Sequence, residues 1–276
     1  MLDLRQTDGY AEYMRLLGWE AGKIKGMYYF CKRLPILGSI IKIQRFDKLV
    51  PIPDLEILAK HKKAFVVFLE PLNNKLFDYY SGKGKFKLAK TTNLPSKTIR
   101  FDLSKKDEKI LKDMHYKTRY NIGLAVRRAV KVRTSKNIHL FSEFWHRSAR
   151  KRGLYFSMRN EIYSIYKAFG GNAIILFAYL KKELIAAVLL IKADKSLHYM
   201  YAASTKEGNR NFAPTLLVWE AIKLAKRIKL KKFDFEGIYD ERYPLKTWKG
   251  FTRFKESFGG KVIVYPGTIR KYYFPF

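Results

Sequence analysis

Residues 173–191 read AIILFAYL-KK-ELIAAVLLI, two apolar runs on either side of a short polar break. Three ionisable residues, Lys181, Lys182 and Glu183, lie at the middle of this tract, where a membrane-spanning helix could least accommodate them. Two apolar runs of eight or nine residues that flank a tight polar turn are typical of an antiparallel β-hairpin. The tract therefore predicts two buried strands, 173–180 and 183–191, in the middle of the chain.

Working outward from the hairpin, apolar periodicity and capping residues predict further elements on both sides. Helices are expected over residues 9–17, 105–114 (with Ser104 as N-cap), 119–129, 140–152 and 215–228. Strands are expected over residues 40–43, 64–69, 198–204, 231–238 and 261–267. From residue 173 onward the order is strand, strand, strand, loop, helix, strand. This is an α+β order, and it matches the core of the acetyltransferase superfamily.

Composition indicates a folded protein with a polyanionic partner. The 276 residues carry a formal net charge of +32, and 47% of them are hydrophobic, so a disordered basic tail is excluded. Residues 111–276 hold 34 basic and 12 acidic side chains, whereas residues 1–110 hold 22 and 12. So large an excess favours nucleic acid or an anionic membrane face as partner. A single cysteine, Cys31, and a charged N-terminal start favour an intracellular protein.

Several common kinds of chemistry lack their motifs. The five histidines show no HxH or HxxxH spacing, and one cysteine cannot complete a zinc set, so no metal is predicted. Neither a GxSxG nucleophile elbow nor a GxxxxGK[ST] loop occurs, which argues against a serine hydrolase and a P-loop ATPase.

Seven segments, in a fixed order, span nearly the whole chain. They are LRQTDGYAEYMRLLGW (4–19), FLEP (68–71), PSKTIRFDLS (95–104), KTRYNIGLAVRRAVKV (117–132), YMYAASTKEGNRNFAP (199–214), FDFEGI (233–238) and GFTRFKESFGGKVIVYPG (250–267). Together they resemble the Fem family of peptidoglycan-bridge aminoacyltransferases. Departures from the family's usual residues include Tyr10 in place of a Trp, Met14 at an often basic position, Ala202 and Glu236 in place of glycines, and residues 43–49, which lack an Arg-Gly-Pro end.

The resemblance implies an α+β fold of two acetyltransferase-like subdomains, each a mixed sheet flanked by helices, without a long coiled-coil arm. Residues 1–110 with 262–276 would form the first, acceptor-side subdomain, and residues 111–261 the second, tRNA-side and catalytic subdomain. The implied reaction moves an amino acid from aminoacyl-tRNA onto a side-chain amine of a peptidoglycan stem peptide. The acceptor would be linked to UDP or to a lipid, which implies a cytoplasmic protein that could work at the inner face of the plasma membrane. Aminoacyl-tRNA would be a co-substrate, and no cofactor is implied.

Phe254 and Lys255 match the family's Phe-Lys pair, which lies where the tRNA acceptor end meets the active site. By that resemblance, Phe254 would stack on a terminal base and Lys255 would stabilise the oxyanion of the tetrahedral intermediate or an adjacent phosphate. Without the resemblance, the sequence RFK would simply be a basic strand end beside a core phenylalanine.

Five further residues are candidates for substrate binding: Arg159, Tyr163, Tyr199, Tyr201 and Glu70. The first two are spaced i, i+4 and share one face if the segment is helical; they resemble the family's Arg-x-x-x-Tyr pair. The two strand tyrosines would point to one face at period two. The carboxylate of Glu70 would orient the ammonium of the incoming acceptor or accept its proton. Packed tyrosines and a solvated strand end are the plain structural alternatives.

The predicted basic helix and its exit carry Arg119, Arg127 and Arg128. Their charge makes them candidates for tRNA contact, and a solvated helix face is the alternative. Two other functions stay open. The loop with Arg210 and Ala213 faintly resembles the pyrophosphate loop of coenzyme A acetyltransferases. A non-catalytic RNA-binding protein would explain the net charge equally well.

Overall fold

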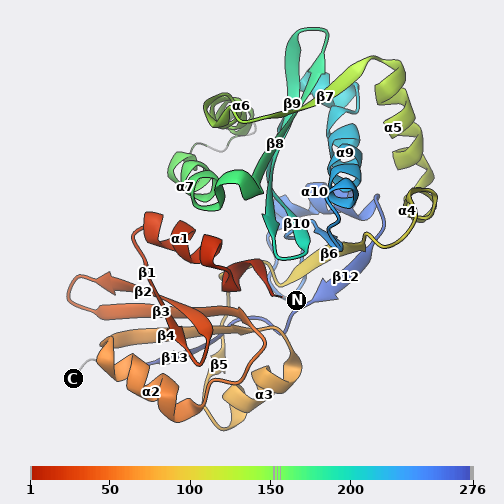
Figure 1. Cartoon of the computed structure of the whole chain (residues 1–276). Coiled ribbons are helices and arrows are strands. Elements are labelled where there is room, and N and C mark those ends of the chain that lie inside the picture. The colour runs from red at the N-terminus through yellow and green to blue at the C-terminus, as the bar shows by residue number, and fades with distance from the viewer. Residues whose placement is uncertain (1, 152, 154, 156, 274–276) are drawn as a thin grey trace. The chain divides into compact units, whose positions relative to one another are not determined.

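The computed structural model describes residues 2–151, 153, 155 and 157–273. The chain divides into two compact units, each assembled from segments that are distant in sequence (Figure 1). The first unit comprises Met1–Lys97, Tyr239–Leu245 and Val264–Phe276, and the second comprises Thr98–Ile238 and Lys246–Ile263. Both units contain a mixed sheet flanked by helices, which confirms the predicted α+β fold.

The first unit is built on a six-stranded sheet of order β1-β2-β3-β4-β13-β5, in which β3 and β4 are parallel. Its elements are η1 (Leu4–Gln6), α1 (Asp8–Leu16), β1 (Glu20–Ile24), β2 (Met27–Leu34), β3 (Gly38–Phe46), α2 (Ile52–His61), β4 (Ala64–Pro71), α3 (Asn74–Gly82), β5 (Lys87–Leu88) and β13 (Ile269–Tyr272). Helices α2 and α3 cover one face and α1 lies on the other (Figure 1). The apolar core lies between the sheet and the pair α2 and α3.

Glu70, one of the predicted substrate residues, lies in the interior of the first unit, with only 2% of its surface exposed. Its carboxylate accepts hydrogen bonds from the Leu94 amide (3.0 Å), the Thr268 hydroxyl (2.7 Å) and the Gln44 side-chain amide (2.9 Å). These donors come from β3, from the segment before β6 and from the segment before β13. Glu70 therefore joins three separate parts of the first unit, and the predicted solvated strand end is not what the structure has.

The second unit holds a seven-stranded sheet of order β12-β6-β11-β10-β9-β8-β7. Its elements are β6 (Lys97–Asp102), α4 (Asp107–Asp113), α5 (Tyr116–Arg127), β7 (Val130–Ser135), α6 (Ile138–Arg150), α7 (Arg159–Phe169), η2 (Gly170–Asn172), β8 (Ala173–Leu180), β9 (Glu183–Ala193), β10 (Ser196–Ser204), α8 (Lys206–Arg210), α9 (Ala213–Arg227), β11 (Lys232–Asp234), η3 (Lys246–Trp248), α10 (Lys249–Glu256) and β12 (Lys261–Val264).

The predicted hairpin is confirmed as β8 and β9, an antiparallel pair that lies between β10 and the edge strand β7. Helices α5 and α9 lie on one side of it and α6 and α7 on the other (Figure 1). Residues Ile185–Ile191 of β9 are all buried, because helices cover both faces of the strand. That double coverage explains why the sequence of β9 is continuously apolar rather than alternating.

Strands β10 and β11 separate partway along their length. They pair in parallel only from Ser196–Lys232 to His198–Asp234; β11 then ends, while β10 continues beside β9 to Ser204. The prediction of a strand through residue 238 is therefore wrong beyond Asp234. Beyond Asp234 the chain no longer pairs with β10, although the Phe235 amide still donates to the Ile99 carbonyl of β6, so an opening forms between β10 and β11.

A β-bulge interrupts β10 at this same level. Tyr199 is opposite Leu190 and Tyr201 is opposite Leu189, so one residue of β10 has no counterpart on β9. Tyr199 packs in the core with Phe233 and Phe235, whereas Tyr201 lies against Trp145 of α6. The prediction that both tyrosines point to one face is wrong, because the extra residue reverses the alternation.

The boundary between the units lies earlier than the expected split near residue 110. Strand β6 is an inner strand of the second sheet, paired with β11, so residues 98–110 belong to the second unit. Residues Tyr239–Leu245 return to the first unit. There Asp240 accepts a 2.5 Å hydrogen bond from the Ser96 hydroxyl and forms an ion pair with Arg242. Burial alone would raise the pKa of Asp240, but these contacts lower it to about 2.

Local differences also concern helices. Residues 249–256, read as a strand end from RFK alone, form α10, and the loop before residue 213 contains α8. Helix α4 begins after Lys106 rather than Ser104, and Arg152, the expected end of α6, lies outside the described residues. Within the described ranges the longest helix is α9, with 15 residues, and none is long and apolar enough to cross a bilayer.

We expect Glu70→Ala to lower the free energy of unfolding by about 3 kcal/mol, because three buried donors would lose a charged acceptor. Chemical denaturation followed by circular dichroism measures this change. Asp47→Ala, at an exposed carboxylate of the same unit, is the control and should cost less than about 0.5 kcal/mol. Equal stability of Glu70→Ala and wild type would show that the hydrogen bonds of Glu70 do not hold the unit together.

Candidate active site

Lys255 is the central charged residue of the candidate site. It lies on the inner face of α10, together with Thr252, and only 9% of its surface is exposed. Its ammonium donates hydrogen bonds to the carbonyl oxygens of Phe235 (2.7 Å) and Gly237 (2.6 Å). These two carbonyls flank Glu236 in the turn that follows β11, so Lys255 fixes the backbone of that turn.

The surroundings of the ammonium are largely aromatic. Ring centroids of Phe251, Tyr199 and Phe235 lie 4.9, 5.8 and 5.8 Å from Nζ. Burial lowers the pKa of Lys255 to about 8, although the carboxylates of Glu236 and Asp234 act in the opposite direction. Lys255 is therefore still mainly cationic at neutral pH, and described residues occupy two of its three N–H donors.

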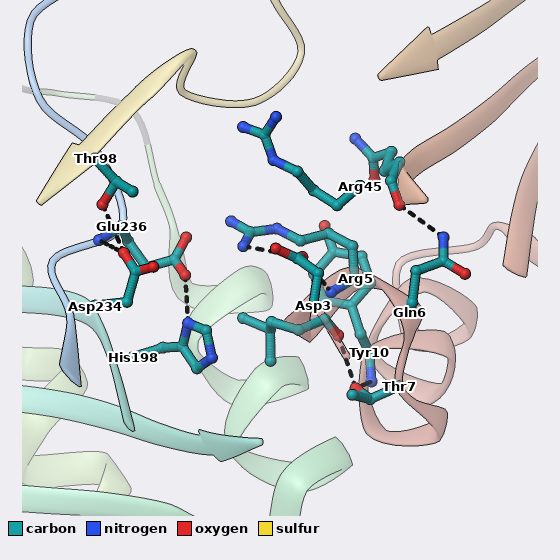
Figure 2. A network of polar contacts seen from close by, with 12 residues as sticks. Asp3, Arg5, Gln6, Thr7, Tyr10, Arg45, Thr98, His198, Asp234 and Glu236 are labelled. Atoms are coloured by element: carbon teal, nitrogen blue, oxygen red, sulfur yellow. Dashed lines mark hydrogen bonds and ion pairs between the residues drawn. The ribbon is translucent and has the colours of Figure 1, made fainter. Parts of the chain in front are cut away.

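A polar cluster that the sequence did not predict lies where β10 and β11 separate (Figure 2). His198 Nδ1 and Glu236 Oε1 are 2.5 Å apart. Asp234 accepts from the Thr98 hydroxyl (2.6 Å), from the Glu236 amide (2.8 Å) and from Arg100 (2.8 and 2.9 Å). Alternation within FDFEGI was the only available signal, since residues 234 and 236 are its two carboxylates.

His198, Asp234 and Glu236 also bring one potential metal-ligand atom each within 4.8 Å of one another. The donor set does not fit a cation, however. Asp234 is saturated by four donors, and two of these belong to the guanidinium of Arg100, whose charge would repel a metal ion. We therefore derive no metal chemistry from this cluster.

A pocket of about 620 Å³ lies at the edge of the second sheet formed by β12 and β6, and it shares Arg100 with the polar cluster. Its lining includes Arg100, Lys105, Lys232, Gly260 and Lys261. Gly260 (φ +89°) has a left-handed backbone, and a Cβ there would come within 2.8 Å of Ile99. The Phe-Gly-Gly sequence after α10 therefore has a steric reason, since the chain must turn tightly here to enter β12.

Among the predicted catalytic and tyrosine residues, the structure brings Lys255 and Tyr199 together. Burial raises the pKa of Tyr199, whose ring packs in the core. Phe254 is half-buried and packs edge-on against Phe258, 5.1 Å between centroids. The more exposed aromatic ring beside the ammonium is that of Phe251, which sequence reasoning did not single out.

Arg159 and Tyr163 do share one face of α7, as the spacing predicted. Arg159 forms an ion pair with Glu143, and the Tyr163 hydroxyl is 2.8 Å from Nδ1 of His139. Both partners lie on α6, so this pair of residues links two neighbouring helices. A role in substrate binding stays a prediction for all five candidates, Arg159, Tyr163, Tyr199, Tyr201 and Glu70.

The three arginines of the basic helix differ in their surroundings. Arg119 donates to the carbonyls of Leu111, Lys112 and Met114 and so caps the end of α4. Arg128 donates to the Arg210 carbonyl at 2.6 Å. Arg127 is exposed and lies 5.6 Å from the ring of Tyr120, which is itself 60% exposed.

We expect the buried charge of Lys255 to give stability an unusual pH dependence. Between about pH 8 and 10.5 the unfolded state binds the proton that the folded state has released, so stability should rise with pH. Over this pH range the free energy of unfolding of the wild type should rise, relative to that of Lys255→Met, by about 3 kcal/mol at most. Denaturation of both proteins at pH 7.5 and 10.5 measures it, and a constant difference between them would contradict the buried, weakened base.

Comparisons with known proteins agree with this architecture. The model of the FemAB family matches residues 79–184 and 181–276. The crystal structure of FemX has a TM-score of 0.82 and 17% identity, over 98% of this chain and 92% of that chain. A tandem GNAT protein from the clavulanic acid biosynthesis pathway has a TM-score of 0.53 and 10% identity, over 91% of this chain and 81% of that chain.

The C-terminal domain of a putative lysylphosphatidylglycerol synthetase from Agrobacterium fabrum has a TM-score of 0.67 and 10% identity, over 96% of this chain and 88% of that chain. A search of curated protein sequences found no significant match. At these identities the structural likeness establishes the tandem acetyltransferase-like fold. The family model covers far more than half of the sequence, so the chain belongs to the FemAB family.

Proposed function

We propose that this protein transfers an amino acid from aminoacyl-tRNA onto the side-chain amine of a peptidoglycan precursor stem peptide. Membership of the FemAB family supports an acyltransferase of this kind. The observation that carries the proposal is the buried Lys255 ammonium beside the opening between β10 and β11. The reaction would take place in the cytoplasm, and at the inner face of the plasma membrane if the acceptor is lipid-linked.

Ester aminolysis needs a cation near the carbonyl oxygen, which becomes negative in the tetrahedral intermediate. Lys255 is held by two carbonyls and keeps a third N–H, which could donate to that oxyanion. Its low exposure strengthens the electrostatic interaction relative to a lysine in water. The exposed ring of Phe251, 4.9 Å from the ammonium, would offer a stacking surface for the terminal adenine.

The segment with Arg210 and Ala213, which faintly resembles a coenzyme A loop, is poorly suited to bind a pyrophosphate. Amides of Gly208, Asn209 and Asn211 already donate within α8, to Thr205 or Glu207. The Phe212 amide donates to the Asn209 carbonyl, and Pro214 has no amide proton. Few backbone donors are left for phosphate oxygens, which favours aminoacyl-tRNA over acetyl-coenzyme A as the acyl donor.

The direct test incubates the protein with charged tRNAs and with UDP-linked or lipid-linked muropeptide, and then measures ester loss and product mass. We expect ester loss that depends on the acceptor, and a mass increase of one or more amino acids. Calorimetry with acetyl-coenzyme A should give no binding signal. Binding of acetyl-coenzyme A without any transfer from tRNA would favour a coenzyme A-dependent acyltransferase, whereas tRNA binding without transfer would favour a non-catalytic RNA-binding protein.

For Lys255→Met we expect transfer to fall by about 100-fold, the scale for losing one oxyanion-stabilising group. Because the substitution also removes two hydrogen bonds to buried carbonyls, rates are compared at a temperature where both proteins are folded by circular dichroism. Lys182→Met, at an exposed lysine in the β8–β9 turn, is the matched control and should transfer at the wild-type rate. A fully active Lys255→Met would contradict the catalytic role.

The exposed pair Arg127 and Tyr120 gives a test of the tRNA surface. We expect Arg127→Ala to reduce the slope of log Kd against log salt concentration by about one, because one phosphate contact would be lost. Arg33→Ala, at an exposed arginine of the first unit, should leave the slope unchanged. An unaltered slope for Arg127→Ala would remove α5 from the tRNA-binding surface.

A further inference from the structure

The polar cluster at the end of β11 contains a buried histidine with one unsatisfied nitrogen. His198 is 3% exposed, and its Nε2 has no hydrogen-bond partner among the residues that the structure describes. Buried polar atoms without partners are rare, and each calls for an explanation such as a bound water or a catalytic role. His198 is the last residue of β10 that pairs with β11, so it lies where the two strands separate.

Hydrogen bonding sets the tautomer of His198. Its Nδ1 lies 2.5 Å from Glu236 Oε1, and a carboxylate can only accept, so Nδ1 carries the proton in the neutral ring. Nε2 then presents a lone pair and is the nitrogen able to accept a proton. The same arrangement of carboxylate, imidazole and unoccupied nitrogen orients a general base in many enzymes.

The backbone at Glu236 is held in an unfavourable conformation that maintains this arrangement. Its φ of +65° costs a non-glycine residue on the order of 1 kcal/mol, and such strain persists only where surrounding contacts enforce it. The contacts are visible: Lys255 binds the carbonyls on both sides of Glu236, and Asp234 accepts from its amide. Thr98 and Arg100 in turn hold Asp234.

We propose that His198 accepts, at Nε2, the proton that the acceptor amine loses when it attacks the aminoacyl ester. This inference rests on the proposed transfer reaction. The amine nitrogen forms a bond to the ester carbonyl carbon, and its proton passes to Nε2. When the intermediate collapses, the bond to the ribose oxygen breaks, and the imidazolium returns the proton to that oxygen. Glu236 stabilises the imidazolium and acts as a positioning residue.

His198→Asn tests the base directly. The side-chain amide of asparagine can still donate to Glu236 but has no basic nitrogen at the Nε2 position, so we expect a loss of about 10²-fold or more in the rate of transfer. His115→Asn is the matched control: His115 is exposed at the N-cap of α5, where asparagine caps equally well, and it should keep the wild-type rate. Thermal melts establish that both variants are folded.

Nitrogen-15 NMR of histidine-labelled wild type gives a readout that does not depend on the variant folding. We expect Nδ1 of His198 to be protonated and Nε2 to be unprotonated at pH 8, and Glu236→Gln to shift this tautomer balance together with a reduced transfer rate. A proton on Nε2 in wild type would overturn the inference.

Equal transfer rates from wild type and His198→Asn would overturn the role of His198 alone and leave the proposed function standing. A wild-type protein that transfers nothing from any charged tRNA to either acceptor would overturn the proposed function and the role of His198 with it. The two failures are therefore distinguishable in one set of assays.

Discussion

The candidate site depends on two hydrogen bonds, which the Lys255 ammonium donates to the carbonyls of Phe235 and Gly237. Burying an isolated ammonium is costly, and the protein offsets that cost with two carbonyl acceptors, three aromatic rings and two nearby carboxylates. In return, the lysine holds a turn whose central residue would otherwise leave the left-handed region. One side chain thus both carries the charge and shapes the polypeptide beside it.

This contact has its effect because of where the second sheet opens. Helices cover both faces of the central strands, so a polar side chain there would have no partner. The separation of β10 from β11 after His198 is the place where backbone and side-chain polar groups become available without disrupting the sheet. The bulge in β10 lies at the same level and turns Tyr199 and Tyr201 to opposite faces.

Sequence patterns predicted the elements that depend on local rules. The β8–β9 hairpin followed from two apolar runs and a polar turn, and the α9 helix from its apolar periodicity, because these features are encoded within a few residues. The bulge could not be predicted, since it is a register shift between two strands and has no distinct sequence. The His198–Glu236 pair joins residues 38 apart, and only the parallel register of β10 and β11 brings them together.

Net charge is a less direct guide to the binding surface than it first suggests. Three basic side chains of the second unit already make structural contacts: Arg100 pairs with Asp234, Arg119 caps α4, and Arg128 donates to the Arg210 carbonyl. A nucleic acid that bound through these groups would have to compete with the contacts that they already make. The charge available to a polyanion is therefore that of exposed residues such as Arg127, whose guanidinium lies near an exposed tyrosine ring. The distribution of such residues, rather than the total of +32, decides where a polyanion would find free cations.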